Sequence, residues 1–207
     1  MSSSEPTVYV VDDDVSFVKA VTRLLRAGGH KAQSFSSVGE FLGSLPPEPS
    51  GCILLDLQMP GQSGFDLQSC LTKAENPLPI IFLTGHGDIP SSVRAMRNGA
   101  VDFLTKPVKK QSLFNAIKSA LTRDVEQRAK RARTRALENR FAGLTLRERE
   151  VMLHVIGGKL NKQVAFDLGT SERTIKAHRA SIMDKLGVKS VAELVRLAEE
   201  LAIQPIR

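Results

Sequence analysis

The fold of the first half of the chain is decided by the stretch Thr7-Val-Tyr-Val-Val-Asp-Asp-Asp14, a short apolar run that ends in acid. The same pattern recurs at Cys52-Ile-Leu-Leu-Asp56. Apolar runs of this length predict buried β-strands, whereas residues 15–27 carry apolar side chains at helical spacing and end at two glycines. A buried strand followed by an amphipathic helix indicates a parallel sheet.

The alternation of strand and helix continues to about residue 120. Strands are predicted at residues 7–11, 31–35, 52–55, 80–83 and 101–104, and helices at residues 15–27, 37–45, 64–74, 89–98 and from about 109 onward. We therefore predict an α/β fold, a doubly wound, five-stranded parallel sheet with helices on both faces. The second strand alternates polar and apolar side chains, which is typical of a sheet edge.

The rest of the chain is predicted to be helical. Residues 112–140 contain neither glycine nor proline and are expected to form one long linker helix. Residues 144–203 predict a small all-α domain, in which two helices at residues 161–168 and 172–186, joined by a short turn, form a helix-turn-helix candidate. The predicted domains are residues 1–121, a helical linker at residues 122–142, and residues 143–207.

The charge is divided unevenly between these parts. The 207 residues carry a net charge of +7. Residues 1–120 hold 11 basic and 11 acidic side chains, whereas residues 121–207 hold 18 basic and 11 acidic ones. This imbalance predicts a polyanionic partner for the C-terminal domain, nucleic acid first, with a basic surface that has no partner as the alternative.

Composition excludes several protein classes. Two cysteines, Cys52 and Cys70, cannot form a disulfide framework and favour a reducing compartment. The first residues lack the basic and apolar regions of a signal peptide, and no apolar run approaches the roughly 18 residues that span a bilayer. We therefore expect a cytoplasmic protein with no membrane partner.

The predicted strands end in residues that suit phosphate chemistry. Parallel strands bring their carboxyl ends to one sheet edge, where ligands bind in such folds. The residues at this edge are Asp12, Asp13, Asp14, Asp56, Thr84 and Lys106. Clustered carboxylates favour Mg²⁺, a carboxylate can accept a phosphoryl group, and a hydroxyl and an ammonium can bind its oxygens. The alternative for the first three acids is that they only cap the following helix.

Motifs at these positions resemble a known family. Val11-Asp-Asp-Asp14, Leu55-Asp-Leu-Gln-Met-Pro-Gly61, Leu83-Thr-Gly-His-Gly-Asp88 and Asp102-Phe-Leu-Thr-Lys-Pro107 resemble the receiver domain of two-component response regulators, in particular the FixJ-like subfamily. Asn161-Lys-Gln-Val-Ala165 and Arg173-Thr-Ile-Lys-Ala-His-Arg179 resemble the LuxR-type DNA-binding domain. The FixJ/NarL group of response regulators combines these two domains.

The resemblance implies a role for each residue of the acidic edge. Asp56 would accept a phosphoryl group from a sensor histidine kinase. Asp13, Asp56 and the Gln58 carbonyl would coordinate Mg²⁺, with Asp12 acting through water. Lys106 and Thr84 would bind the phosphoryl oxygens.

Further residues of the receiver motifs would act in switching and in hydrolysis. Phe103 would move inward with Thr84 as a second switch residue, with plain core packing as the alternative. Gln58 and His86 would influence the lifetime of the phosphate, although His86 could equally be an uninvolved loop residue. The reaction is metal-assisted phosphoryl transfer to the protein itself.

The helix at residues 172–186 is the expected recognition helix. Lys176 and Arg179 are candidates for contacts with base edges, with Ala177 close to the bases because it is small. Candidates for phosphate contacts are Ser171, Arg173, Thr174 and His178, with Asn161 or Lys162 from the preceding helix. A basic amphipathic helix is by itself more often a solvated face, and His178 alone would suit the edge of a core.

The combined prediction is a phosphorylation-controlled transcriptional regulator that binds double-stranded promoter DNA and is not an enzyme in the usual sense. We expect phosphorylation to cause dimerisation through residues 90–98, 101–105 and 109–121, with release of an inhibitory domain contact as the alternative. RNA polymerase stays open as a partner. The rival classes are a haloacid-dehalogenase-type phosphatase, which leaves the helix-turn-helix unexplained, and an RNA-binding antiterminator, for which an aromatic platform is missing.

Overall fold

The computed structural model describes residues 5–61, 63–73, 77–85 and 88–206. The chain divides into two compact units, residues 1–128 and 129–207. Among the described residues, no helix combines the length and the apolar character needed to cross a membrane.

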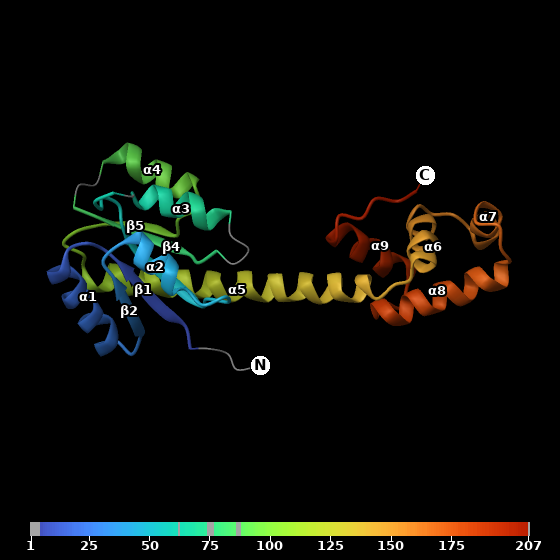
Figure 1. Cartoon of the computed structure of the whole chain (residues 1–207), viewed down its shortest axis with the longest axis horizontal. Coiled ribbons are helices and arrows are strands. Elements are labelled where there is room, and N and C mark those ends of the chain that lie inside the picture. The colour runs from blue at the N-terminus through green and yellow to red at the C-terminus, as the bar shows by residue number, and fades with distance from the viewer. Residues whose placement is uncertain (1–4, 62, 74–76, 86–87, 207) are drawn as a thin grey trace. The chain divides into compact units, whose positions relative to one another are not determined.

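The first unit is an α/β domain, as predicted (Figure 1). Its strands are β1 (Thr7–Val11), β2 (Lys31–Phe35), β3 (Gly51–Asp56), β4 (Ile80–Thr84) and β5 (Asp102–Thr105). Within the described residues they form one five-stranded sheet in the order β2-β1-β3-β4-β5. Every pair of neighbouring strands is parallel.

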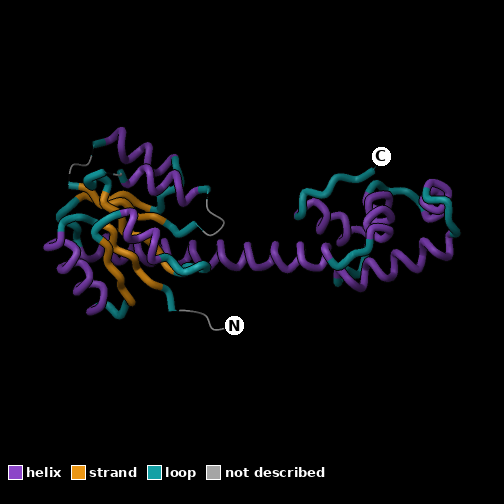
Figure 2. Tube along the Cα trace, viewed as in Figure 1, coloured by secondary structure: helices purple, strands orange, loops and turns teal. Residues whose placement is uncertain are grey.

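Helices cover both faces of this sheet (Figure 2). They are α1 (Val15–Ala27), α2 (Val38–Ser44), α3 (Gly64–Thr72), α4 (Ile89–Arg97) and the first part of α5 (Lys110–Ala142). Side chains of α1 and α5 pack with Val8, Val10 and Leu54 on one face, and side chains of α2, α3 and α4 pack on the other. Because β1, β3 and β4 are covered on both sides, they are buried along their length and consist almost entirely of apolar residues.

Several helix ends follow from local capping chemistry. Asp14 caps α1 by accepting hydrogen bonds from the backbone N–H groups of Ser16 and Phe17. Asp88 caps α4 by accepting a hydrogen bond from the Ser91 N–H. The capping alternative for the acidic run therefore holds for Asp14, the third residue of the run, which leaves the first two to be explained by the site.

The side chains expected to form the dimer face are those of Val93, Ala95, Met96, Val101, Lys110 and Leu113, and two of these six are buried. Ala95 is 0% exposed and Leu113 is 1% exposed, since both side chains face the sheet. Val93 (42%) and Met96 (47%) on α4 are exposed, as expected, and so is Ile89 (79%), which was not among the expected residues.

The second unit is all-helical around one apolar core. It contains the end of α5 and the helices α6 (Leu146–Ile156), α7 (Asn161–Asp167), α8 (Glu172–Leu186) and α9 (Val191–Glu200). Thr145 and Glu148 form the capping box that their spacing predicts. Gly187 ends α8 with a left-handed backbone, φ 68°, which glycine adopts without strain.

Candidate functional site

The carboxyl edge of the sheet brings together an ammonium and two buried carboxylates. Asp12 follows β1 and is 1% exposed, and Asp56 ends β3 and is 5% exposed. Lys106 follows β5, and its Nζ lies 2.6 Å from Asp12 Oδ2 and 3.1 Å from Asp56 Oδ1. The sheet order places β1, β3 and β4 side by side, so residues far apart in sequence meet at one point.

Three carboxylates at this edge fit a divalent cation. One ligand oxygen each from Asp12, Asp13 and Asp56 lie within 4.8 Å of one another. Asp13 is exposed, so water has access to the third carboxylate. Mg²⁺ takes hard oxygen ligands and keeps several waters, which matches this donor set better than a nitrogen- or sulfur-binding metal.

Burial and the Lys106 ammonium shift the pKa of Asp56 in opposite directions. Burial raises the pKa of Asp56, the nearby Asp12 carboxylate adds to this, and the Lys106 ammonium partly offsets both. Burial alone would lower the pKa of Lys106, but its hydrogen bonds to Asp12 and Asp56 outweigh that effect and raise it. The ammonium is therefore held in its charged form between the two carboxylates.

The other predicted receiver residues lie around this edge. Thr84 ends β4 and is 1% exposed, and it lies opposite Thr105 in the sheet register. Phe103 on β5 is half-buried, with its ring centroid 6.3 Å from that of Phe82. Gln58 is exposed. The peptide bond between Lys106 and Pro107 is cis. His86 lies outside the described residues.

Phe17 contacts the site although it was not predicted from the sequence. The Lys106 Nζ lies 4.4 Å from the centre of the Phe17 ring on α1, which is a cation–π distance. No local pattern distinguishes this phenylalanine from the apolar residues that dock α1 on the sheet.

The helix-turn-helix candidate is formed by α7 and α8. Ser171 caps α8 by accepting a hydrogen bond from the Thr174 N–H, at 3.1 Å. The exposed candidates for DNA contact are Lys162, Ser171, Arg173, Thr174, Lys176 and Ala177. His178 is half-buried, on the flank of the helix. The face that carries Ile175, Ile182 and Leu186 is buried in the core.

Arg179 differs from Lys176 in its surroundings. Lys176 is exposed, whereas Arg179 is half-buried and donates a hydrogen bond to Asn161 Oδ1 on α7, at 2.7 Å. Arg179 thus joins the two helices of the motif, which the charge pattern alone did not indicate. At 100° per residue it lies closer to the core face of α8 than Lys176 does.

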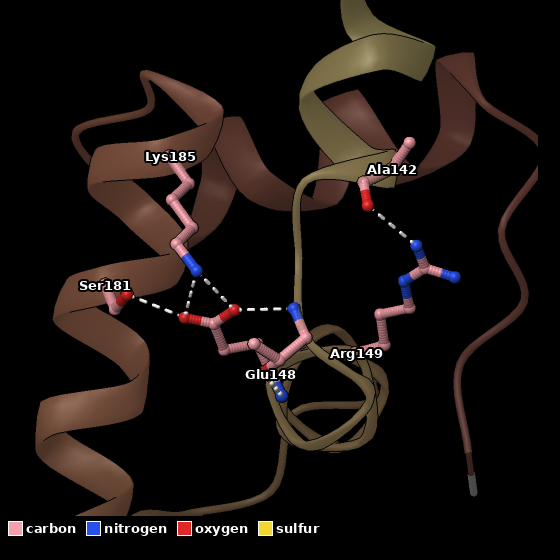
Figure 3. Close-up of polar contacts among 6 residues, drawn as sticks. Ala142, Glu148, Arg149, Ser181 and Lys185 are labelled. Atoms are coloured by element: carbon pink, nitrogen blue, oxygen red, sulfur yellow. Dashed lines mark hydrogen bonds and ion pairs between the residues drawn. The ribbon is translucent and has the colours of Figure 1, made fainter.

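Glu148 makes contacts across the second unit that its local sequence pattern does not indicate. Beyond capping α6, its buried carboxylate accepts hydrogen bonds from Ser181 and Lys185 of α8, at 2.6 and 2.7 Å (Figure 3). The Lys185 ammonium, Ser181 and the Thr145 N–H lower the pKa of Glu148 to about 2. Glu148 therefore connects the start of α6 to the recognition-helix candidate.

Comparisons with known proteins agree with both units. Residues 8–118 match the model of the response regulator receiver domain, and residues 142–198 match that of the bacterial regulatory proteins of the luxR family. The chain is 43% identical to nodulation protein W of Bradyrhizobium diazoefficiens, over 98% of this chain and 89% of that protein. It is 41% identical to the transcriptional regulatory protein FixJ of the same organism, over 92% of this chain and 93% of FixJ.

Solved structures give the same result. The response regulator StyR matches with a TM-score of 0.82 and 46% identity, over 95% of this chain and 100% of that chain. Full-length FixJ from B. japonicum matches with a TM-score of 0.57 and 37% identity, over 96% of this chain and 98% of that chain. FixJ is named as a transcriptional regulatory protein and StyR as a response regulator. The chain therefore belongs to the response regulators, as a transcriptional regulator of the FixJ-like group that joins a receiver domain to a LuxR-type DNA-binding domain.

Proposed function

We propose that Asp56 is the phosphoryl acceptor of this regulator. The observation that carries the proposal is the placement of Asp56 between two further carboxylates and the Lys106 ammonium. Asp12, Asp13 and Asp56, with the Gln58 carbonyl, would hold Mg²⁺, and Asp12 would act through water. When bound, the ion would offset the repulsion between the carboxylates and an incoming phosphoryl group.

The chemistry is a displacement at phosphorus. A carboxylate oxygen of Asp56 forms a bond to the phosphorus of a phosphohistidine on the sensor kinase, and the bond from phosphorus to the imidazole nitrogen breaks. Lys106 binds one phosphoryl oxygen and thereby leaves Asp12. Thr84 brings its hydroxyl to another oxygen, and Phe103 follows into the space that Thr84 leaves.

DNA recognition is assigned to α8 and the start of α7. Lys176 and Arg179 would reach base edges, and Ala177 would lie against them. Ser171, Arg173, Thr174, His178 and Lys162 would contact phosphates. The basic excess of the C-terminal part supports double-stranded promoter DNA as the partner. The domains of this proposal are residues 1–121, 122–142 and 143–207, and the site of action is the cytoplasm, where bacterial DNA lies.

Dimerisation on phosphorylation would use the exposed side of α4 with β5 and α5. Ile89, Val93 and Met96 support this because they are exposed apolar residues on one helix. Two DNA-binding domains would then meet two half-sites. RNA polymerase would be the next partner at the promoter.

Acetyl phosphate labelling tests the acceptor. Asp56→Asn should abolish the acid-labile, hydroxylamine-sensitive phosphate, because an amide is a poor nucleophile toward phosphorus. Asp66→Asn, a change at an exposed aspartate on α3, should keep normal labelling in the presence of Mg²⁺. Normal stoichiometry in Asp56→Asn would refute the assignment.

A further inference from the structure

Asp124 is a buried acidic side chain far from the phosphoacceptor edge. It lies on α5 and is 1% exposed. Its Oδ2 accepts hydrogen bonds from the Gly51 N–H at 3.1 Å and the Ser50 hydroxyl at 3.5 Å. Gly51 begins β3, whose other end carries Asp56. Asp124 therefore joins α5 to the amino edge of the sheet, opposite the edge where Asp56 lies.

The backbone at this contact is built around the glycine. Gly51 has φ +130°, and a Cβ placed there would lie 1.8 Å from the Thr7 carbonyl oxygen. The Thr7 N–H donates to the Ser50 carbonyl at 2.9 Å, which holds the start of β3 against β1. The Gly51 N–H is left for Asp124, and a buried N–H needs such an acceptor.

Asp124 is the last buried residue of α5. The helix begins at Lys110, shortly after Lys106, and packs through Leu113 and Ile117. After Asp124 comes Val125, which is 63% exposed. Apolar packing is non-directional and lets a helix slide or turn, whereas a hydrogen bond to a backbone N–H fixes its position.

Asp124 fixes α5 at a point far along the helix from Lys106. The first turns of α5 follow the segment that carries Lys106, which must move when it exchanges Asp12 for a phosphoryl oxygen. While the contact between Asp124 and Gly51 holds, a movement of the segment that carries Lys106 turns α5 as one rigid helix. If this contact is lost, residues 121–128 absorb the movement by local opening.

We propose that Asp124 is a positioning residue that couples phosphorylation of Asp56 to the linker helix, by holding α5 to the start of β3. The proposal rests on the proposed function. It assigns to Asp124 no part in phosphoryl transfer itself, because the residue lies at the opposite end of the strands.

The test compares Asp124→Ala, Asp124→Asn and Glu126→Ala in the full chain. Glu126 is an exposed acid on the same helix, so its change removes the same charge without breaking the contact. Three quantities are measured: phosphorylation of Asp56 by acetyl phosphate, the ratio of DNA affinities with and without phosphorylation, and hydrogen exchange of residues 50–56 and 119–128.

We expect Asp124→Ala to keep phosphorylation within about twofold of the unmodified chain, while the affinity ratio, about 5–150-fold for a typical coupling, falls to less than about threefold. Exchange should accelerate at Gly51 and in residues 121–128. Asp124→Asn, which keeps the size and one acceptor oxygen, should fall between Asp124→Ala and the unmodified chain, and it decides the question if Asp124→Ala does not fold. Glu126→Ala should change none of the three quantities.

A normal affinity ratio in a folded Asp124 variant whose exchange is accelerated would overturn the proposal, because the contact would then be structural only. Unchanged exchange would overturn it as well, because the contact would not hold the helix. If the unmodified chain shows no effect of phosphorylation on DNA affinity, the proposed function fails, and the exchange data still decide whether Asp124 holds α5.

Discussion

The Lys106 ammonium lies closer to Asp12 than to Asp56, at 2.6 Å against 3.1 Å. In the unmodified receiver, Lys106 thus occupies the space between two carboxylates that would also hold the metal ion. Under the proposed function, Lys106 would give up part of this contact when Mg²⁺ binds or when Asp56 carries a phosphoryl group. Lys106 would then link metal binding, phosphorylation and the movement of the segment after β5.

Lys106→Met should tighten Mg²⁺ binding by about 5- to 10-fold, because it removes a positive charge that competes for Asp12 and Asp56. A unit charge about 4 Å away contributes between about 1 and 4 kcal/mol depending on solvent exposure. Methionine keeps the stem length and the contact with Phe17. Isothermal titration calorimetry measures the effect, and Lys109→Met, at an exposed lysine nearby, is the control. Weaker binding in Lys106→Met would contradict this account.

Val93→Asp should prevent dimerisation of the phosphorylated chain, because it places a charge in the exposed apolar side of α4. The measurement is analytical ultracentrifugation at tens of micromolar with and without beryllofluoride. Leu42→Asp, a matched change on α2 at 38% exposure, should leave the dimer intact. A beryllofluoride-treated chain that stays monomeric, while the C-terminal domain alone binds DNA more tightly than the whole, would favour release of an inhibitory contact instead.

Lys176→Ala should cost roughly 1–3 kcal/mol at the specific site and relax preference at one base pair, without loss of stability. Arg179→Ala should cost a similar amount, but it should also loosen α7 from α8, since Arg179 donates to Asn161. Binding to a set of operator variants, together with thermal unfolding, separates the two. An equal loss on every DNA sequence would show that a residue contacts only phosphates.

Glu148→Gln should lower the stability of the second unit at pH 7 by about 1–2 kcal/mol, because the charged hydrogen bonds to Lys185 and Ser181 weaken. The folded-state pKa of Glu148 is about 2, below its ordinary 4.5. Its contribution is therefore complete above about pH 4.5 and is lost as the pH falls toward 2.

Hydrogen exchange of residues 144–198 between pH 7 and pH 3, corrected for intrinsic rates, measures this effect. The difference between Glu148→Gln and the unmodified chain should shrink as the pH falls. Glu150→Gln, at an exposed acid on the same helix, should show no comparable difference. A difference that does not depend on pH would mean that the carboxylate charge is not responsible.

Much of the fold could be predicted because its signals are local. The apolar run of β1 and the spacing of apolar residues in α1 lie within one element each. The cap at Asp88 and the capping box of Thr145 and Glu148 depend on residues three apart. Element ends were less predictable: α3 ends at Thr72 rather than at residue 74, since the stop depends on how the last turn packs.

The amino-acid sequence alone is enough to place Asp12, Asp56, Thr84 and Lys106 at or directly after the ends of strands, and the order of the motifs predicts what these residues do. These features depend on residue type and short spacing. Asp12 and Lys106 are 94 residues apart, yet their meeting was predictable because parallel strands always share one carboxyl edge.

Contacts between separate elements follow from the tertiary packing alone. Phe17 lies against Lys106, and half-buried Arg179 donates a hydrogen bond to Asn161. Buried Asp124 accepts a hydrogen bond from the Gly51 N–H at the start of β3. No pattern in the sequence marks these contacts. The reason is physical: burial and hydrogen-bond partners depend on which surfaces of separate elements pack together, and several packings satisfy the same local pattern.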